Sequence, residues 1–164
     1  MGRIASIAFS SPGENQRPED HYHRVPVQSA ALIAGQGIET DRKGKGGDRQ
    51  INIMSSATLA QLAAEGFKTA PGEMGEQVVL DGIDIDSLPA KTRLRLGASA
   101  VVELVLPRTG CDRFEHIQGK HKKLARGRLG MIARVVASGP IAVGDPVAVE
   151  PMATSEGSKP LAGG

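Results

Sequence analysis

Residues 101–114 read VVELVLPRTGCDRF and hold the single cysteine of the chain, Cys111. The apolar run Val101–Leu106 predicts a buried strand. Pro107 cannot donate a hydrogen bond to a sheet, so the strand is expected to end there. Gly110 marks a turn after the strand. Cys111 is therefore expected where a strand leaves the core, and not inside the core.

Two arginines, Arg108 and Arg113, flank Cys111 in the sequence. Positive neighbours favour the thiolate over the thiol, and the thiolate is the form that attacks electrophiles and binds metals. A lone cysteine is also commonly a small buried apolar residue that performs no chemistry. These residues alone leave both interpretations of Cys111 open.

The length and composition of the chain limit the class of protein. The 164 residues suffice for one domain, and a single cysteine excludes an internal disulfide framework, which favours a reducing compartment. No signal-peptide pattern and no membrane-length apolar run is present, so we expect a soluble, cytoplasmic protein that does not contact a membrane. A net charge of +2, one tyrosine, three phenylalanines and no tryptophan argue against nucleic acid as a partner.

Short apolar segments rich in valine and isoleucine alternate with turns made from 21 glycines and 10 prolines, which is typical of a mainly β domain. Helical spacing predicts a helix over 57–65, and a helical turn is expected over 112–117. We predict a closed or nearly closed β-barrel with one or two short helices over residues 1–150, followed by a disordered tail over 151–164. Strands are expected at 3–9, 30–34, 50–54, 77–80, 92–96, 100–106, 131–136, 141–143 and 147–149.

The segment 35–49 is rich in glycine and in charge, with cations at Arg42, Lys43, Lys45 and Arg49. Backbone N–H groups and cations in such a loop can bind an anion. The segment lacks the residues of a phosphate-binding P-loop and the glycine spacing of a dinucleotide site. A solvated loop without a ligand is the alternative interpretation.

Three further patterns are weaker candidates for a function. The basic run 120–128 is typical of a solvated loop, and nucleic-acid binding is its less favoured interpretation. The acidic side chains at 81, 84 and 86 do not match a calcium loop and are interpreted as solvated turn residues. A zinc site is the third pattern, and its possible ligands are His21, His23, Cys111, His116 and His121. The spacing of these residues matches no structural zinc motif.

The order of several segments is more specific than any one of them. These segments are residues 37–42, 47–53, 71–76 (PGEMGE), 88–97, 107–111 (PRTGC), 130–135 and 139–145. Together they resemble the MOSC family, which is named for the C-terminal domain of molybdenum-cofactor sulfurase. The resemblance covers roughly residues 1–150.

The resemblance implies a mainly β fold and a link to the molybdenum cofactor, a phosphorylated pterin (molybdopterin) whose dithiolene sulfurs hold the metal. In the family, the signature cysteine is thought either to ligate molybdenum or to carry sulfur as a persulfide, and that position is Cys111 here. Some relatives reduce N-hydroxylated compounds. Cations near the cysteine and in the 35–49 loop suit the cofactor's phosphate and pterin. The resemblance therefore gives cofactor-binding candidates at Asp41, Arg42, Lys43, Arg49, Arg108, Thr109 and Arg113.

The chain departs from the family pattern at Thr40, where many relatives have glycine, and at Lys43, where they have histidine. It also has no counterpart of the N-terminal β domain of longer relatives. Three functions follow as alternatives: a cofactor-dependent oxidoreductase, a sulfur carrier that works with a partner redox or sulfur-transfer protein, and a non-catalytic binding module that uses the basic run 120–128.

Overall fold

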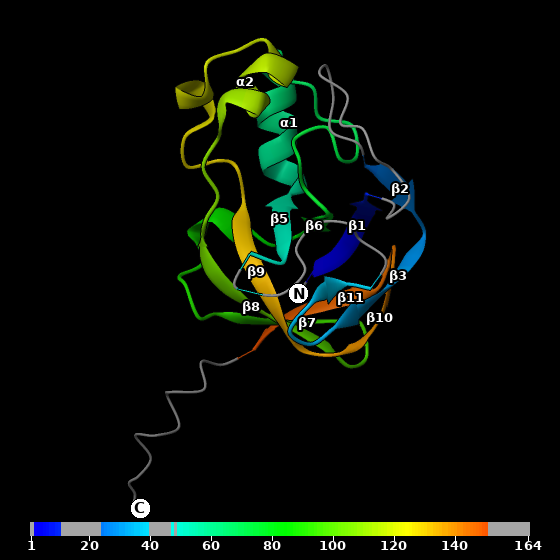
Figure 1. The fold of residues 1–164 in the computed structure, drawn as a ribbon. Helices are drawn as coiled ribbons and strands as arrows, with labels where there is room; N and C mark the ends of the chain where they lie inside the picture. Colours follow the sequence, from blue (N-terminus) through cyan, green and yellow to red (C-terminus); the bar gives the residue numbers. More distant parts are fainter. Residues whose placement is uncertain (1, 11–23, 40–46, 48, 151–164) are drawn as a thin grey trace, which may run out of the picture.

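The computed structural model describes residues 2–10, 24–39, 47 and 49–150, and a barrel of strands with helices at one end dominates it (Figure 1). The helices are α1 (Ser56–Ala64), α2 (Asp112–Gln118) and the short 3-10 turns η1 (Ile85–Ser87) and η2 (Lys122–Ala125). The strands are β1 (Gly2–Phe9), β2 (Val25–Val27), β3 (Ser29–Ile33), β4 (Gly37–Ile38), β5 (Ile51–Ser55), β6 (Val78–Asp81), β7 (Arg93–Leu96), β8 (Ala100–Pro107), β9 (Met131–Ala137), β10 (Gly139–Ala142) and β11 (Pro146–Glu150).

Seven strands form a closed barrel in the order β11-β7-β8-β9-β5-β6-β1, and the first and last of them pair with each other. The β5–β6 pair is parallel and the other pairs of the ring are antiparallel. Closure leaves no exposed edge in the ring, which removes the risk of pairing with another chain. The predicted mainly β barrel is therefore confirmed, and it is fully closed.

The barrel has an apolar interior and a second apolar cluster outside its wall. Alternate residues of the strands fill the interior, including Val102 and Leu104 of β8. The second cluster joins Met54 of β5 to Leu62 of α1 and Phe114 of α2. All five residues of β5 are buried; Ile51 and Ile53 pack in the interior, and Met54 packs in the outer cluster. This arrangement fixes both α-helices against one end of the barrel (Figure 1).

Most predicted elements are observed, with small shifts at their ends. The helix predicted over 57–65 is α1, and the turn predicted over 112–117 is the full helix α2. Pro107 is the last residue of β8, as its missing N–H group predicts. The predicted tail over 151–164 lies outside the described residues. Among the described residues, no helix combines the length and apolar composition needed to cross a bilayer.

Two segments between the expected strands differ from the sequence prediction. Gly139 and Pro140 precede the strand expected at 141–143, yet they already belong to strand β10, where Pro140 lies opposite Ala31 of β3. Because β10 pairs with β3 at the end of the order β10-β3-β4, the proline can be accommodated at a sheet edge. The basic run 120–128 is not simply a solvated loop, because η2 buries Ala125 against the outer cluster.

A substitution at Gly130 tests the close packing between β9 and β5. Gly130 has a φ of +83°, and an added Cβ atom would overlap the carbonyl oxygen of Ile53. We expect Gly130→Ala to lower the free energy of unfolding by about 3 kcal/mol or more, measured by urea denaturation.

Gly144→Ala is the matched control, since Gly144 has a φ of +95° but no atom lies within 4 Å of an added Cβ. It should lower the free energy of unfolding by only about 1 kcal/mol, which is the backbone contribution. Equal losses in the two variants would show that contact with Ile53 does not matter.

Candidate functional site

Cys111 lies between strand β8 and helix α2 and is exposed. It is the N-cap residue of α2, and its carbonyl oxygen accepts a hydrogen bond from the N–H of Glu115 at 3.1 Å. The segment before it is fixed because the N–H of Arg108 donates to the carbonyl oxygen of Gly130 at 3.0 Å. The prediction that Cys111 lies where the strand leaves the core is confirmed. The alternative interpretation, a small buried apolar residue, is wrong because Cys111 is exposed.

Arg108 is held in place by a hydrogen bond and by an aromatic ring. Its Nη1 donates to the carbonyl oxygen of Met74 at 2.5 Å, and its guanidinium lies 5.9 Å from the ring centroid of Phe114. Phe114 itself is fully buried in the outer cluster. A half-buried guanidinium held by a carbonyl and an aromatic face is a preorganised anion-binding group.

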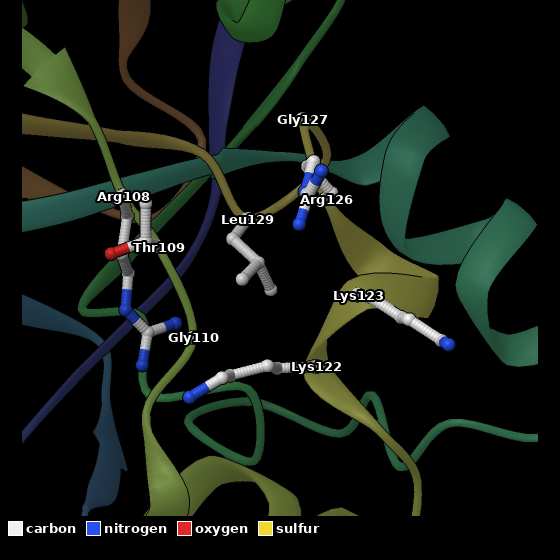
Figure 2. Close-up of a pocket in the computed structure, with 8 residues that line it drawn as sticks. All are labelled: Arg108, Thr109, Gly110, Lys122, Lys123, Arg126, Gly127 and Leu129. Atoms are coloured by element: carbon white, nitrogen blue, oxygen red, sulfur yellow. The ribbon is translucent and has the colours of Figure 1, made fainter.

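A cavity of about 160 Å³, which we call the lysine cavity, opens directly beside the Cys111 segment (Figure 2). The guanidinium of Arg108 and the ammonium of Lys122 point toward the same region of it, whereas Lys123 points away from Arg108 (Figure 2). Lys122 also lies 3.5 Å from a carboxylate oxygen of the exposed Asp112. Two converging cations favour an anionic ligand. The lining residues are Arg108, Thr109, Gly110, Lys122, Lys123, Arg126, Gly127 and Leu129.

A second cavity of about 290 Å³, which we call the arginine cavity, shares Arg108 with the first. Its other cations are Arg24 and Arg49. Arg24 donates to the carbonyl oxygen of Gly75 through Nε at 3.2 Å and Nη2 at 2.9 Å. Arg108 therefore links two positively charged cavities. The lining residues are Arg24, Arg49, Gln50, Ile51, Asn52, Gly75, Gln77, Arg108 and Ile132.

One buried carboxyl group, Glu76, shapes the turn that holds both arginines. Its two oxygens accept hydrogen bonds from the N–H groups of Gly72 at 2.7 Å and Met74 at 3.1 Å. Burial raises the pKa of the Glu76 carboxyl, and the N–H donors, led by that of Gly72, oppose this rise. Since the turn's amides satisfy Glu76 on one side, the carbonyls of Met74 and Gly75 are available to Arg108 and Arg24 on the other.

The predicted cofactor-binding residues fall into three groups. Arg108 and Thr109 line the lysine cavity, and Arg49 lines the arginine cavity together with Arg108. Arg113 is half-buried on α2 and lines neither of these two cavities. The other predicted residues lie outside the described part of the chain; they are Asp41, Arg42 and Lys43.

Sequence reasoning missed several residues that line the cavities. The basic run was interpreted as solvent-exposed, yet it contributes Lys122, Lys123 and Arg126 to the lysine cavity. Arg24 and Asn52 carried no recognisable signal, because an isolated arginine and one polar residue in an alternating strand are both common. The motif PGEMGE was the available signal for Glu76, since a glutamate inside a glycine-rich turn can accept several backbone N–H groups.

The structure also describes Asp86 and part of the possible zinc-ligand set. Asp86 is not a solvated turn residue: it is half-buried and accepts hydrogen bonds from Thr58 Oγ1 at 3.1 Å and from the N–H of Gly130 at 3.0 Å. Burial raises its pKa, and these two donors oppose the rise. For zinc, His116 and His121 are exposed, and the described residues contain no group of three or more His, Cys, Asp or Glu that could hold a metal. The remaining two histidines of that set are not among the described residues.

Comparison with known proteins places the chain in a family. The family model for the MOSC domain matches residues 33–148. The chain belongs to the MOSC domain family. No curated protein matches the sequence significantly.

Solved structures show that the fold of this MOSC domain also occurs in other proteins. The YuaD protein from Bacillus subtilis has a TM-score of 0.70 at 20% identity, covering 90% of this chain and 94% of that protein. YiiM from Geobacillus stearothermophilus has a TM-score of 0.70 at 21% identity, covering 92% and 76%. YiiM from Escherichia coli has a TM-score of 0.66 at 19% identity, covering 91% and 70%.

Glu76→Gln tests whether the buried carboxyl group holds the arginine-binding turn. Glutamine keeps one acceptor but places an NH₂ group against the second backbone N–H, so that donor loses its partner. We expect the free energy of unfolding to fall by about 1–3 kcal/mol in urea denaturation.

The control is Glu73→Gln. The Glu73 side chain accepts one hydrogen bond, from the N–H of Ala70 at 2.9 Å, and the single oxygen of glutamine can still accept it. Its free energy of unfolding should change by less than about 0.5 kcal/mol. If Glu76→Gln behaved like this control, the turn would not depend on the carboxyl group.

Proposed function

We propose that this MOSC domain binds the molybdenum cofactor, with Cys111 as the ligand of the metal. The observation that carries the proposal is the juxtaposition of an exposed cysteine with two cation-lined cavities that share Arg108. A thiolate is a soft ligand and suits molybdenum. Membership of the MOSC domain family supports the proposal, since the family is named for a protein of molybdenum-cofactor metabolism.

The residues present fit the chemistry of the cofactor. A phosphate monoester carries up to two negative charges and needs cations and N–H donors. Arg108 and Lys122 provide converging cations, and Thr109 and Gly110 provide a hydroxyl and backbone close to the cysteine. Arg49 supplies a further cation on the other side of Arg108.

In this proposal the bound cofactor supplies a redox metal centre that reduces N-hydroxylated compounds. Removal of a hydroxyl group from nitrogen consumes two electrons and two protons and releases water, so a partner redox protein has to deliver the electrons. The chain's own residues have simpler roles. Cys111 anchors the metal, Arg108 orients the cofactor, and the exposure of Cys111 leaves one side open to substrate or partner.

Sulfur transfer is the second candidate function, and the exposure of Cys111 favours it specifically. The Cys111 thiolate would attack the outer sulfur of a donor persulfide, form a new S–S bond, and release the donor's thiolate. A client would then receive that sulfur by the reverse chemistry. An exposed thiol is accessible to two successive partners, which a carrier requires.

The non-catalytic binding module receives less support from the structure. Arg128 of the basic run forms a two-pronged ion pair with Glu65, the C-cap residue of α1, with N–O distances of 2.6 and 2.8 Å. Lys122 lies close to Asp112. These carboxylates reduce the charge that the run could offer to nucleic acid.

The first test is the molybdenum content of protein co-expressed with an active cofactor pathway. We expect near-stoichiometric molybdenum in the wild type by mass spectrometry and less than a tenth of it in Cys111→Ala. His116→Ala, an exposed change on the same helix, is the control and should retain the metal. Cyanide-releasable sulfur without molybdenum would replace the enzyme proposal with the carrier, and neither metal nor sulfur on Cys111 would refute both.

A second test removes the shared cation. Arg108→Gln should weaken cofactor retention at least about tenfold, because charge-assisted hydrogen bonds contribute roughly 1.5–3 kcal/mol. Lys122→Gln should give a smaller loss in the same direction, because the Lys122 ammonium already lies 3.5 Å from a carboxylate oxygen of Asp112.

Arg95→Gln is the control, since Arg95 is an exposed residue of β7 that pairs with Glu150 and lines neither cavity. Thermal unfolding of each variant separates loss of cofactor from loss of structure. Full molybdenum retention in a folded Arg108→Gln protein would remove Arg108 from the site.

A further inference from the structure

Gln118, the last residue of α2, joins this helix to the segment that leads into the arginine-binding turn. The residue is only 5% exposed. Its Oε1 accepts a hydrogen bond from the N–H of Lys68 at 2.7 Å, and its Nε2 donates to the carbonyl oxygen of Lys68 at 3.0 Å. The same Nε2 donates to the carbonyl oxygen of Glu73 at 3.1 Å. Gln118 therefore pairs with the backbone of this segment as a neighbouring strand would.

Met74 connects Gln118 to Arg108. Its Sδ lies 3.1 Å from Nε2 of Gln118, and its side chain is fully buried. The carbonyl oxygen of the same residue accepts the hydrogen bond from Nη1 of Arg108. Phe114, on the helix that Gln118 ends, lies against the guanidinium of Arg108. Arg108, the turn and α2 thus form a closed ring of contacts, and Cys111 lies in this ring where the chain passes from Arg108 to α2.

Helix α2 depends on such contacts because it is short. It has seven residues, too few to hold its own shape without support from the rest of the protein. It ends at Gly119, which has a φ of +69° and directly follows Gln118. The amide of Gln118 therefore holds the far end of the helix that begins beside Cys111. Without this amide, the helix and the guanidinium of Arg108 would be free to shift relative to each other.

We propose that Gln118 is a positioning residue, which sets the place of the Arg108 guanidinium relative to the Cys111 thiol. Its side chain bonds to Lys68, Glu73 and Met74, so it acts on both groups through the turn and through α2. The inference rests on the proposed function only in taking Cys111 as the working residue of the domain. It predicts that an anion approaching Cys111 is attracted by a cation that Gln118 holds in place.

The experiment measures how fast Cys111, the single cysteine, reacts with two disulfides in the full chain expressed without a cofactor pathway. Dithiobis(nitrobenzoate) carries two carboxylates, and dithiodipyridine is neutral. In both reactions the Cys111 thiolate attacks one sulfur of the reagent, a new S–S bond forms, and the other half of the reagent leaves as a thiolate. Because the same thiolate attacks in both cases, the ratio of the anionic to the neutral rate constant reports the attraction by nearby cations.

We expect this ratio at low salt to be at least about threefold lower in Gln118→Met than in the wild type, and the two ratios to converge at high salt, where the cations are screened. Methionine fills the same buried space but cannot pair with the backbone. Arg108→Gln should lower the ratio by at least as much. The double variant should lower it no further than Arg108→Gln alone, because Gln118 acts through Arg108.

Gln118→Asn is the milder second variant, since its shorter amide cannot reach all three partners, and it should lower the ratio by a smaller factor. Ile141→Val is the control, because Ile141 is fully buried in the barrel interior on β10. Its truncation should lower the urea midpoint and leave the ratio unchanged. A lowered midpoint with an unchanged ratio in both Gln118 variants would show a purely structural role and overturn the inference. Effects of Gln118→Met and Arg108→Gln that multiply in the double variant would also overturn it.

The molybdenum measurement separates this inference from the proposed function, since the two rates need no cofactor. A lowered ratio in Gln118→Met supports the inference even if Cys111→Ala retains molybdenum and the proposed function fails. An unchanged ratio in Gln118→Met, together with loss of molybdenum in Cys111→Ala, would overturn the inference and leave the proposed function standing.

Discussion

The absence of a side chain at Gly130 is the constraint on which the site depends. Its backbone approaches the carbonyl of Ile53 so closely that no Cβ atom fits. Its N–H donates to Asp86, and its carbonyl oxygen accepts from the N–H of Arg108. Three segments that are distant in the sequence therefore meet at one residue. Because Arg108 is fixed there, the three residues between it and the start of α2, including Cys111, emerge from the barrel at a defined point.

The way in which the arginines are held matters as much as their position. A backbone carbonyl fixes a guanidinium through its dipole and adds no net negative charge beside it, in contrast to a carboxylate. The turn over residues 71–76 provides two such carbonyls, at Met74 and Gly75. Glu76 is the buried group that organises this turn from within. Glu76 thus supports the cavity wall through the backbone of the turn, and the charge of Arg24 opposes the rise that burial causes in the pKa of Glu76.

The sequence predicted what depends on local pattern and missed what depends on long-range packing. Alternating Val and Ile residues predicted the barrel strands, and the missing N–H of Pro107 predicted where Cys111 would emerge. Asp86 was misjudged because its partners, Thr58 and Gly130, lie 28 and 44 residues away. Asn52 was overlooked for a related reason: the strand pattern directs it out of the barrel, but only the closed structure shows that the outer face is covered there.

Redox catalysis and sulfur transfer require opposite surroundings for Cys111. A reaction at a metal benefits from exclusion of water, because electrostatic interactions strengthen in a water-poor site. A sulfur carrier needs an open thiol that two partners can reach in turn. The described structure combines fixed cations beside Cys111 with exposure of the cysteine itself. Under either proposal the exposed side of Cys111 has to be covered by something other than the described residues during the reaction, whether a substrate or a partner protein. The cations of the lysine cavity border that opening, so an acidic or phosphorylated surface is the complement they favour.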